Sequence, residues 1–254
     1  MVDTLVAKKA LGQNFLTDQT VVQLMIDALG VQPNDTIIEI GSGTGAVTKP
    51  LAQVCQAKDA HLTAVEFDID LIPLLESAVP QTDQVTIINA NILNFLEDFK
   101  VPKNNSFKII GSLPYNITSP LLHQLIKFQP QPEQIVILIQ KEVAQKICDQ
   151  PPRSNYLSVF VQTFYEAKIL KVVDKSLFNP VPAVDGAVLQ FLKKPLSPNF
   201  DISRYEKFLH HIFSHPRKML NKVLTKEELE KYNFAGTKRA QDYNHEQYLK
   251  AFLS

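Results

Sequence analysis

The chain has 254 residues, which is enough for one large domain or for a domain of ordinary size with a small appendage. Its 26 basic residues balance its 26 acidic residues, so total charge favours no class of partner and any nucleic-acid surface must be a local patch. Cys55 and Cys148 lie far apart and match no metal spacing, and no run is long and apolar enough for a membrane span. These features predict a cytoplasmic protein without a disulfide or metal framework.

Strands and helices alternate through the first part of the chain. Apolar residues recur at helical intervals over residues 18–29, behind a possible cap at Asp18 and before a stop at Gly30. Strands are predicted at residues 36–40, 62–66, 85–88, 107–111 and 134–139, with helices at 71–78 and 120–128. This alternation predicts an α/β fold, in which a mostly parallel, Rossmann-like sheet carries helices on both faces.

The composition changes after the last strands. Residues 167–173 and 183–191 are predicted to form an antiparallel hairpin that completes the sheet. Pro195 and Pro198 then mark a linker, and helices are expected at 202–213, 217–224 and 245–252. We therefore predict a first domain of residues 1–194 and a small helical domain of residues 195–254.

A glycine-rich segment, residues 41–45, follows the first strand of the sheet. Its glycines let a ligand approach the backbone closely, and Gly41, Gly43 and Gly45 give the spacing G-x-G-x-G. That spacing lacks the third glycine position of the dinucleotide fingerprint, which weakens the hypothesis that the chain is a nicotinamide-dependent oxidoreductase. Glu66 ends the second strand about 20 residues further on, where an acid can accept both hydroxyls of a ribose. Because S-adenosylmethionine carries no pyrophosphate, it is the leading cofactor.

Asn91 follows the third strand and offers both an acceptor and a donor to the edge of an adenine ring. The alternative is a polar residue that faces solvent at a strand end. Parallel sheets bind ligands beyond the carboxyl ends of their strands, and Asn91 lies at such an end.

The segment Gly-Ser-Leu-Pro-Tyr-Asn, residues 111–116, ends the fourth strand. Pro114 fixes its own φ and restricts Leu113 to extended geometry. The carbonyls of Ser112 and Leu113 and the ring of Tyr115 are expected to face one small space, which suits a planar ligand with an amino group. A tight strand-to-helix turn with a packing tyrosine is the simpler alternative.

Five segments, taken in order, resemble the ribosomal RNA adenine dimethyltransferase family. They are residues 9–16, 39–45, 111–116, 140–143 and 178–185, and the resemblance covers nearly the whole chain. The Leu-Gly-Gln-Asn-Phe-Leu opening and the Phe-x-Pro-x-Pro-x-Val-Asp element fit the bacterial small-subunit branch better than the large-subunit relatives that confer macrolide resistance.

The resemblance implies an enzyme that moves methyl groups from S-adenosylmethionine to N6 of two adjacent adenosines near the 3′ end of 16S ribosomal RNA. The implied partner is an immature small ribosomal subunit, and we expect a monomer. The resemblance also implies that Asn14 and Leu16 help close the cofactor site, that Gly41 lies against the methionine moiety and that Glu66 binds the ribose. Gly43 and Gly45 belong to the same cofactor loop.

The target adenine is expected at Ser112, Leu113, Pro114, Tyr115 and Phe178. An exocyclic amine is a poor nucleophile because its lone pair is delocalised into the ring. Acceptors at Ser112 and Leu113 would favour a geometry that frees this pair, while Tyr115 stacks on the base and Phe178 covers its other face.

Two residues depart from the family pattern. Asn91 stands where the family usually has an acid, and Ser112 stands where it usually has asparagine. They support an alternative function, that of a ribosome assembly or RNA-binding factor with weak or no methyl transfer.

Basic residues at both ends of the chain are the candidate RNA contacts. In the family, the segment that corresponds to Arg217 and Lys218 helps hold RNA, and Lys222, Lys8 and Lys9 are expected to add contacts. Neighbouring acidic residues allow the alternative of an ordinary charged surface. The histidines show no metal spacing, and we expect no metal ion.

Overall fold

The computed structural model describes residues 8, 11–80, 82–102, 106–113, 117–195 and 200–254. The chain groups into two compact units, one built around a sheet and one helical. The sheet unit comprises Met1–Lys141 and Ile169–Leu192, and the helical unit comprises Glu142–Lys168 and Lys193–Ser254. Residues 142–168 therefore group with the C-terminal helices, and the domain boundary after residue 194 stays a prediction.

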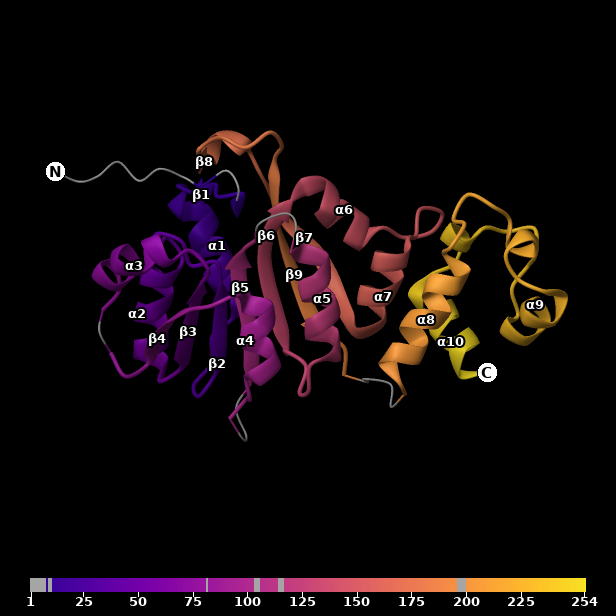
Figure 1. Cartoon of the computed structure of the whole chain (residues 1–254), viewed down its shortest axis with the longest axis horizontal. Coiled ribbons are helices and arrows are strands. Elements are labelled where there is room, and N and C mark those ends of the chain that lie inside the picture. The colour runs from indigo at the N-terminus through magenta and orange to yellow at the C-terminus, as the bar shows by residue number, and fades with distance from the viewer. Residues whose placement is uncertain (1–7, 9–10, 81, 103–105, 114–116, 196–199) are drawn as a thin grey trace. The chain divides into compact units, whose positions relative to one another are not determined.

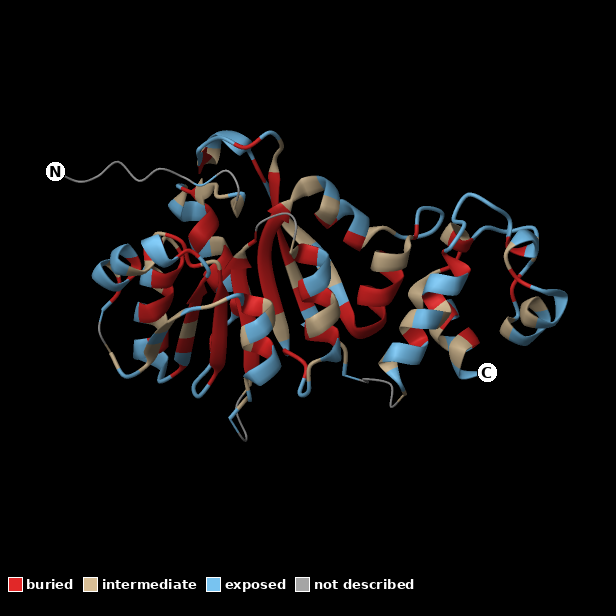
Figure 2. Cartoon of the chain, in the orientation of Figure 1, coloured by how far each residue is buried: buried red, intermediate tan, exposed pale blue. Residues whose placement is uncertain are grey.

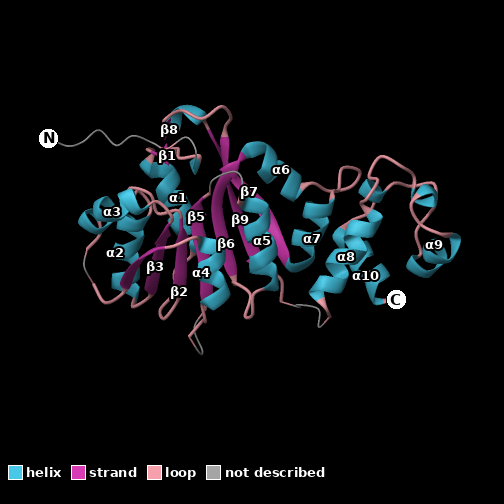
Figure 3. Cartoon of the chain, viewed as in Figure 1, coloured by secondary structure: helices cyan, strands magenta, loops and turns pink. Residues whose placement is uncertain are grey.

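The sheet has seven strands in the order β4-β3-β2-β5-β6-β9-β7. Strands β2 to β6 pair in parallel, and β9 pairs antiparallel with β6. Figure 3 shows these strands side by side among the helices. The arrangement confirms the predicted Rossmann-like α/β fold. The strands are β2 (Thr36–Ile40), β3 (His61–Glu66), β4 (Val85–Asn89), β5 (Phe107–Ser112), β6 (Gln134–Gln140), β7 (Tyr165–Val173) and β9 (Gly186–Lys193).

Helices cover both faces of this sheet. Figure 1 shows α4 (Ile92–Asp98) and α5 (Thr118–Lys127) in front of it. Helix α1 (Gln19–Leu29) packs against β5 and β6, α2 (Thr48–Lys58) against β3, and α3 (Ile72–Ala78) against β4. As predicted, Asp18 caps α1 by accepting a hydrogen bond from the Val21 amide at 2.9 Å, and Gly30 ends it with φ of 56°. None of the helices in the described part of the chain could cross a membrane.

The central strands form the core, and all five residues of β2 are buried (Figure 2). At the amino ends of the strands, Lys108 pairs with Asp35 at 2.7 Å and donates to the Gly30 carbonyl at 2.7 Å. Both side chains are buried, so each compensates the charge of the other. This buried ion pair lies at the end of the sheet opposite to the carboxyl ends of the strands. Ligands are expected at the carboxyl ends.

A second sheet of two short strands joins distant parts of the chain. Strand β1 (Phe15–Leu16) pairs antiparallel with β8 (Phe178–Asn179). Thr17 donates from its backbone amide at 2.9 Å and from its hydroxyl at 2.8 Å to the Leu177 carbonyl. The N-terminal motif and the proline-rich motif thus meet next to Thr17 and Leu177, which are 160 positions apart.

In the helical unit, α7 (Tyr156–Phe164), α8 (Ile202–Ile212) and α10 (His245–Leu253) pack together. Their contact surface is largely aromatic, and Thr163 and Tyr205 share a buried hydroxyl hydrogen bond at 2.9 Å. The other helices are α6 (Lys141–Cys148) and α9 (Lys226–Tyr232). Short 3₁₀ turns lie at η2 (Ile69–Leu71), η3 (Lys175–Leu177), η4 (Leu220–Lys222) and η5 (Ala240–Asp242).

The helix predicted over residues 217–224 is wrong. A single turn, η4, occupies its centre, and Met219 instead forms a bridge with Arg239. The Leu220 amide donates to the Lys238 carbonyl at 2.8 Å, and the Asn221 amide donates to the Gly236 carbonyl at 3.0 Å. These tertiary hydrogen bonds replace the helical ones.

Candidate functional site

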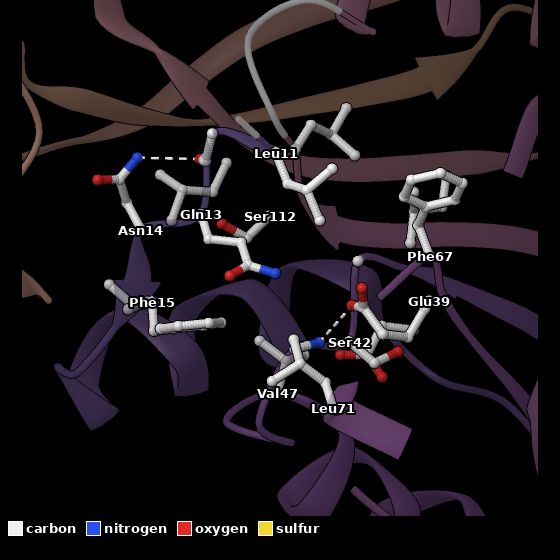
Figure 4. A pocket seen from close by; sticks show the side chains of 18 of the residues that line it. Leu11, Gln13, Asn14, Phe15, Glu39, Ser42, Val47, Phe67, Leu71 and Ser112 are labelled. Atoms are coloured by element: carbon white, nitrogen blue, oxygen red, sulfur yellow. Dashed lines mark hydrogen bonds between the residues drawn. The ribbon is translucent and has the colours of Figure 1, made fainter. Parts of the chain in front are cut away.

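A cavity of about 270 Å³ opens at the carboxyl ends of the parallel strands (Figure 4). Its wall combines the N-terminal strap, defined here as residues 11–16, with the glycine-rich loop and with the ends of β3, β4 and β5. It brings together these predicted residues: Asn14, Leu16, Gly41, Gly43, Glu66, Asn91, Ser112, Leu113 and Phe178. Pro114 and Tyr115 lie outside the described residues.

Left-handed glycines shape the loop after β2. A Cβ on Gly41, whose φ is 71°, would stand 3.0 Å from the Ser112 carbonyl oxygen, so the loop touches the end of β5. Gly43 adopts φ of 56° and lies against the Phe15 ring of the strap. Gly45 is not among the residues that line the cavity, and a Cβ there would meet Leu75 of α3 at 3.2 Å. Its place is therefore between the loop and α3.

Glu66 is buried at the end of β3 with both carboxylate oxygens directed to backbone amides. One oxygen accepts from the Gly43 amide at 2.8 Å and the other from the Asp68 amide at 2.7 Å. Each carboxylate oxygen has a second lone pair, so the group can still accept from two hydroxyls. The first of these hydrogen bonds also fixes the glycine-rich loop against the acid.

Glu39 is a cavity residue for which sequence reasoning assigned no role. Burial raises the pKa of its carboxyl to about 7, and the charge of Glu66 adds to this effect, while the Thr48 and Ser42 hydroxyls counteract it. No hydrogen bond of normal geometry reaches its Oε2 from any residue that the structure describes. A buried acceptor without a partner costs free energy when the carboxyl is charged, which agrees with the raised pKa. The signal in the sequence was the acid just before the glycine-rich loop.

The end of β4 supplies the residues beside Glu66. The Asn91 side chain accepts from the Leu93 amide at 2.9 Å and so caps α4. The Asn89 side chain donates to the carbonyls of Glu66 and Phe67 at 2.9 and 3.0 Å. Phe67 lines the cavity with 59% of its surface exposed, and sequence reasoning missed it. A large aromatic residue directly after the candidate ribose acid was the available signal.

The end of β5 forms the opposite wall. Leu113 is buried, and its amide donates to the Leu138 carbonyl at 3.0 Å, which continues the β5–β6 ladder to the cavity. Phe178 of β8 lies above Gly186 of β9, where an added Cβ would come within 3.1 Å of the ring. Ser112 and Phe178 thus face the same cavity from different sheets.

Contacts within the strap and next to it restrain its conformation. The Asn14 side chain (Figure 4) donates to the Gly12 carbonyl at 3.0 Å. Leu16 is buried in β1. The Lys8 ammonium forms ion pairs with Asp68 and Asp70, each at 2.6 Å. Lys9 lies outside the described residues.

The other basic candidates lie in the helical unit. Arg217, Lys218 and Lys222 are exposed, and none of them forms an ion pair with a described residue. Within the described ranges, no three His, Cys, Asp or Glu side chains are placed to hold a metal ion.

Known proteins with the same fold include a 23S rRNA methyltransferase and a dimethyladenosine transferase. The crystal structure of the 23S rRNA methyltransferase ErmE superposes with a TM-score of 0.74 and 24% identity, over 94% of this chain and 98% of that one. A dimethyladenosine transferase from Plasmodium falciparum gives 0.79 and 21%, over 94% and 96%. At these identities the similarity establishes the fold.

Sequence comparison is more specific. A "Ribosomal RNA small subunit methyltransferase A" from Sulfurihydrogenibium sp. is 31% identical over 247 residues, which cover 96% of this chain and 95% of the relative. A protein of the same name from Streptococcus pneumoniae is 36% identical over 229 residues, which cover 86% and 77%. The model of the family described as ribosomal RNA adenine dimethylase matches residues 5–254. The chain belongs to the ribosomal RNA adenine dimethylase family, as its motifs predicted.

Proposed function

We propose that this chain binds S-adenosylmethionine in the cavity and dimethylates N6 of two adjacent adenosines near the 3′ end of 16S ribosomal RNA. Its family makes it an rRNA adenine methyltransferase, and the particular adenosines and the immature small subunit are the finer part of the proposal. One observation carries it: Glu66, the glycine-rich loop and the end of β5 line the same cavity.

The polar groups of the cavity match the parts of this cofactor. The free lone pairs of Glu66 would accept from the two ribose hydroxyls. The Glu39 carboxyl, which also lines the cavity, would attract the methionine ammonium when it is ionised. Asn91 and the exposed face of Phe67 are placed for the adenine edge and ring. The residues present thus fit the cofactor, which supplies a methyl group activated by a sulfonium.

The target amine would enter on the Ser112 side. The Ser112 hydroxyl and the Leu113 carbonyl accept from the two amine hydrogens, so that the nitrogen lone pair turns out of conjugation toward the methyl group. Because a Cβ on Gly41 would approach the Ser112 carbonyl oxygen to 3.0 Å, methionine and base sites adjoin. The nitrogen would take the methyl group that the sulfonium activates, and the amine would then lose a proton to solvent. Alignment provides most of the acceleration in such an in-line transfer.

Aromatic side chains would hold the target base. Tyr115 stacks on one face, which contributes about 1 to 3 kcal/mol by comparison with other stacked bases, and Phe178 covers the other. The role of Tyr115 rests on the sequence. The adenine must leave its stack to reach the cavity, which costs least in a single-stranded loop.

The helical unit would bind the RNA backbone. Residues 142–168 and 193–254 hold 15 Lys and Arg against 10 Asp and Glu, although the whole chain is neutral. Exposed Arg217, Lys218 and Lys222 suit phosphate groups. We propose that the protein acts as a monomer in the cytoplasm, where ribosomal subunits mature.

The test uses undermethylated small ribosomal subunits, the protein and cofactor labelled at the methyl group. Mass spectrometry of the digested RNA should find dimethyladenosine at two adjacent positions. The matched control is Glu66→Ala, which removes the ribose acceptor and should abolish labelling at low cofactor concentration. Absence of dimethyladenosine with cofactor bound to the protein would contradict the proposal.

The alternative of an assembly factor without transfer is not favoured. Both of the sequence relatives reported above are named methyltransferases. Asn91 and Ser112 both line the cavity together with Glu66 and the glycine-rich loop.

A further inference from the structure

The strap over the cofactor cavity is attached at its two ends. Its C-terminal end, β1, pairs with β8. Its N-terminal end is held by side chains, because Lys8 and Gln13 both reach Asp68, which follows Glu66 in the sequence by two positions. All six strap residues line the cavity, and three of them, Gln13, Phe15 and Leu16, take part in these attachments.

Asp68 is the centre of the second attachment. Its side chain is 3% exposed, and one oxygen pairs with the Lys8 ammonium at 2.6 Å while the other accepts from the Gln13 side chain at 2.7 Å. The Lys8 backbone amide in turn donates to the Gln13 side-chain oxygen at 2.7 Å. The Asp68 amide donates to Glu66 at 2.7 Å. One residue therefore links the strap to the acid that we assign to the ribose.

Hydrogen bonds hold the Asp68 side chain in its charged form. Burial raises its pKa, but the hydrogen bonds from Lys8 and Gln13 outweigh burial and hold the pKa below the ordinary value. The carboxylate is therefore ionised at neutral pH. Lys8 also pairs with Asp70, but that side chain is 71% exposed, and exposed pairs contribute little. The buried partner, Asp68, is the one that holds Lys8.

We propose that Asp68 is a positioning residue that holds the strap closed through Lys8 and Gln13 and so slows the release of cofactor. The inference rests on the proposed function, because it takes the cavity as the cofactor site. It assigns roles to Asp68, to Gln13 of the N-terminal motif and to Lys8 that do not require contact with substrate. Release then requires Lys8 and Gln13 to leave Asp68 before the strap can lift.

The test measures binding of S-adenosylhomocysteine without RNA, so that any contact of Lys8 with phosphate has no influence. Lys8→Met should raise the dissociation constant about tenfold, chiefly through a faster dissociation rate, since a charge-assisted hydrogen bond to a buried group is lost. Lys8→Arg keeps the charge and should bind like the wild type. Asp70→Asn, which removes the exposed partner, is the matched control and should change binding less than twofold.

Hydrogen exchange separates a closed strap from general stability. In Lys8→Met and Asp68→Asn, amides of residues 11–17 should exchange faster while those of β5 and β6 keep their protection. Equal affinity of Lys8→Met and the wild type, or unchanged exchange in the strap, would overturn the inference even if Asp68→Asn fails to fold. If the wild-type protein does not bind S-adenosylhomocysteine, the proposed cofactor site itself is wrong, which is a different outcome.

Discussion

Asn91 shows how one atom changes what a site can recognise. Its oxygen is directed to the Leu93 amide, because the first turn of α4 needs an acceptor there. That oxygen keeps one lone pair for the exocyclic amine of adenine, but the helix cap already fixes its position, and the amide nitrogen can only donate. Asn91 therefore offers the amine a shared acceptor, while its nitrogen can serve a ring nitrogen. An aspartate could cap the helix with one oxygen and accept from the amine with the other.

We predict that Asn91→Asp strengthens cofactor binding. The gain of one hydrogen bond to the adenine amine corresponds to about 1 kcal/mol, or roughly a fivefold lower dissociation constant. The N-terminus of α4 also favours the added negative charge. Calorimetric titration with S-adenosylhomocysteine measures the change, and Asn91→Ala is the control that loses both the cap and the contact. Equal or weaker binding by the aspartate variant would refute this account.

Glu39 makes a second prediction at the residue scale. Its pKa in the folded protein is about 7, above the ordinary value of 4.5, so folding favours its protonated form. Burial of this carboxyl therefore leaves the free energy of unfolding unchanged below pH 4.5 and lowers it progressively as the pH rises to 7. Above pH 7 the loss is about 3 kcal/mol. Glu39→Gln removes this buried charge, so it should raise the free energy of unfolding of the cofactor-free protein at pH 8. At pH 4.5 it should change that free energy little.

Thermal unfolding of the protein without cofactor, at pH 4.5 to 8, measures the difference between wild type and Glu39→Gln. Glu76→Gln on the exposed face of α3 is the matched control for the loss of one acidic group. A Glu39→Gln difference that is constant across this range would show that the carboxyl is not held in the protonated form.

At the scale of elements, Gly111 joins the two central strands where they enter the site. It pairs with Ile40 in the β2–β5 register, and a Cβ there would stand 2.4 Å from the Ile40 carbonyl oxygen. A backbone atom has little freedom to move away, so the strands must separate. Because Ser112 is the next residue, this separation would also displace the base site.

Gly111→Ala should therefore reduce the free energy of unfolding by at least about 3 kcal/mol and abolish methyl transfer. Gly30→Ala is the control: an added Cβ there has no atom within 4 Å, and only its φ of 56° opposes the substitution. That change should cost about 1 kcal/mol and leave activity intact. Urea unfolding measures the loss in free energy of unfolding for each variant. Equal losses would show that the structure relieves the contact with Ile40 without losing stability.

Helices and strands with a regular hydrophobic pattern were predictable from the sequence, whereas those that depend on contacts between distant segments were not. Helix α1 alternates buried and exposed faces, and β2 is a compact β-branched run, so local patterns sufficed. Helix α7 is buried at seven successive residues, Ser158–Phe164, and shows no exposed face that would mark a helix. Strands β1 and β8 have two residues each and exist only because they pair across the chain.

The same distinction applies to the site. Glu66 and Asn91 were predictable because strand ends of a parallel sheet gather ligands, a rule that needs only the strand boundaries. Gly45 shares the pattern of Gly41 and Gly43, but its packing against α3 depends on tertiary structure. The free lone pair of Glu39 and the attachment of Lys8 to Asp68 likewise arise from contacts between distant segments.

At the scale of the whole molecule, neutrality conceals an uneven distribution of charge. The helical unit carries an excess of five basic residues, and the sheet unit carries the matching acidic excess. The residues that line the cavity belong to the sheet unit, so we expect substitutions of exposed basic residues in the helical unit to act on RNA alone. Cofactor affinity and RNA affinity are therefore separable by mutation.

We predict that replacing Arg217, Lys218 and Lys222 by Ala weakens binding to small subunits without changing the affinity for S-adenosylhomocysteine. If each residue contacts one phosphate, the slope of log affinity against log salt should fall by about 2 to 3, because fewer counterions are released. Dimethylation should then need more subunit for half-maximal rate but reach a similar maximal rate. Lys226, Lys231 and Lys250 replaced by Ala have the same change in net charge and serve as the control. An equal effect of both triple variants would mean that the helical unit attracts RNA through its net charge, and that the segment around Arg217 is not a phosphate-binding site.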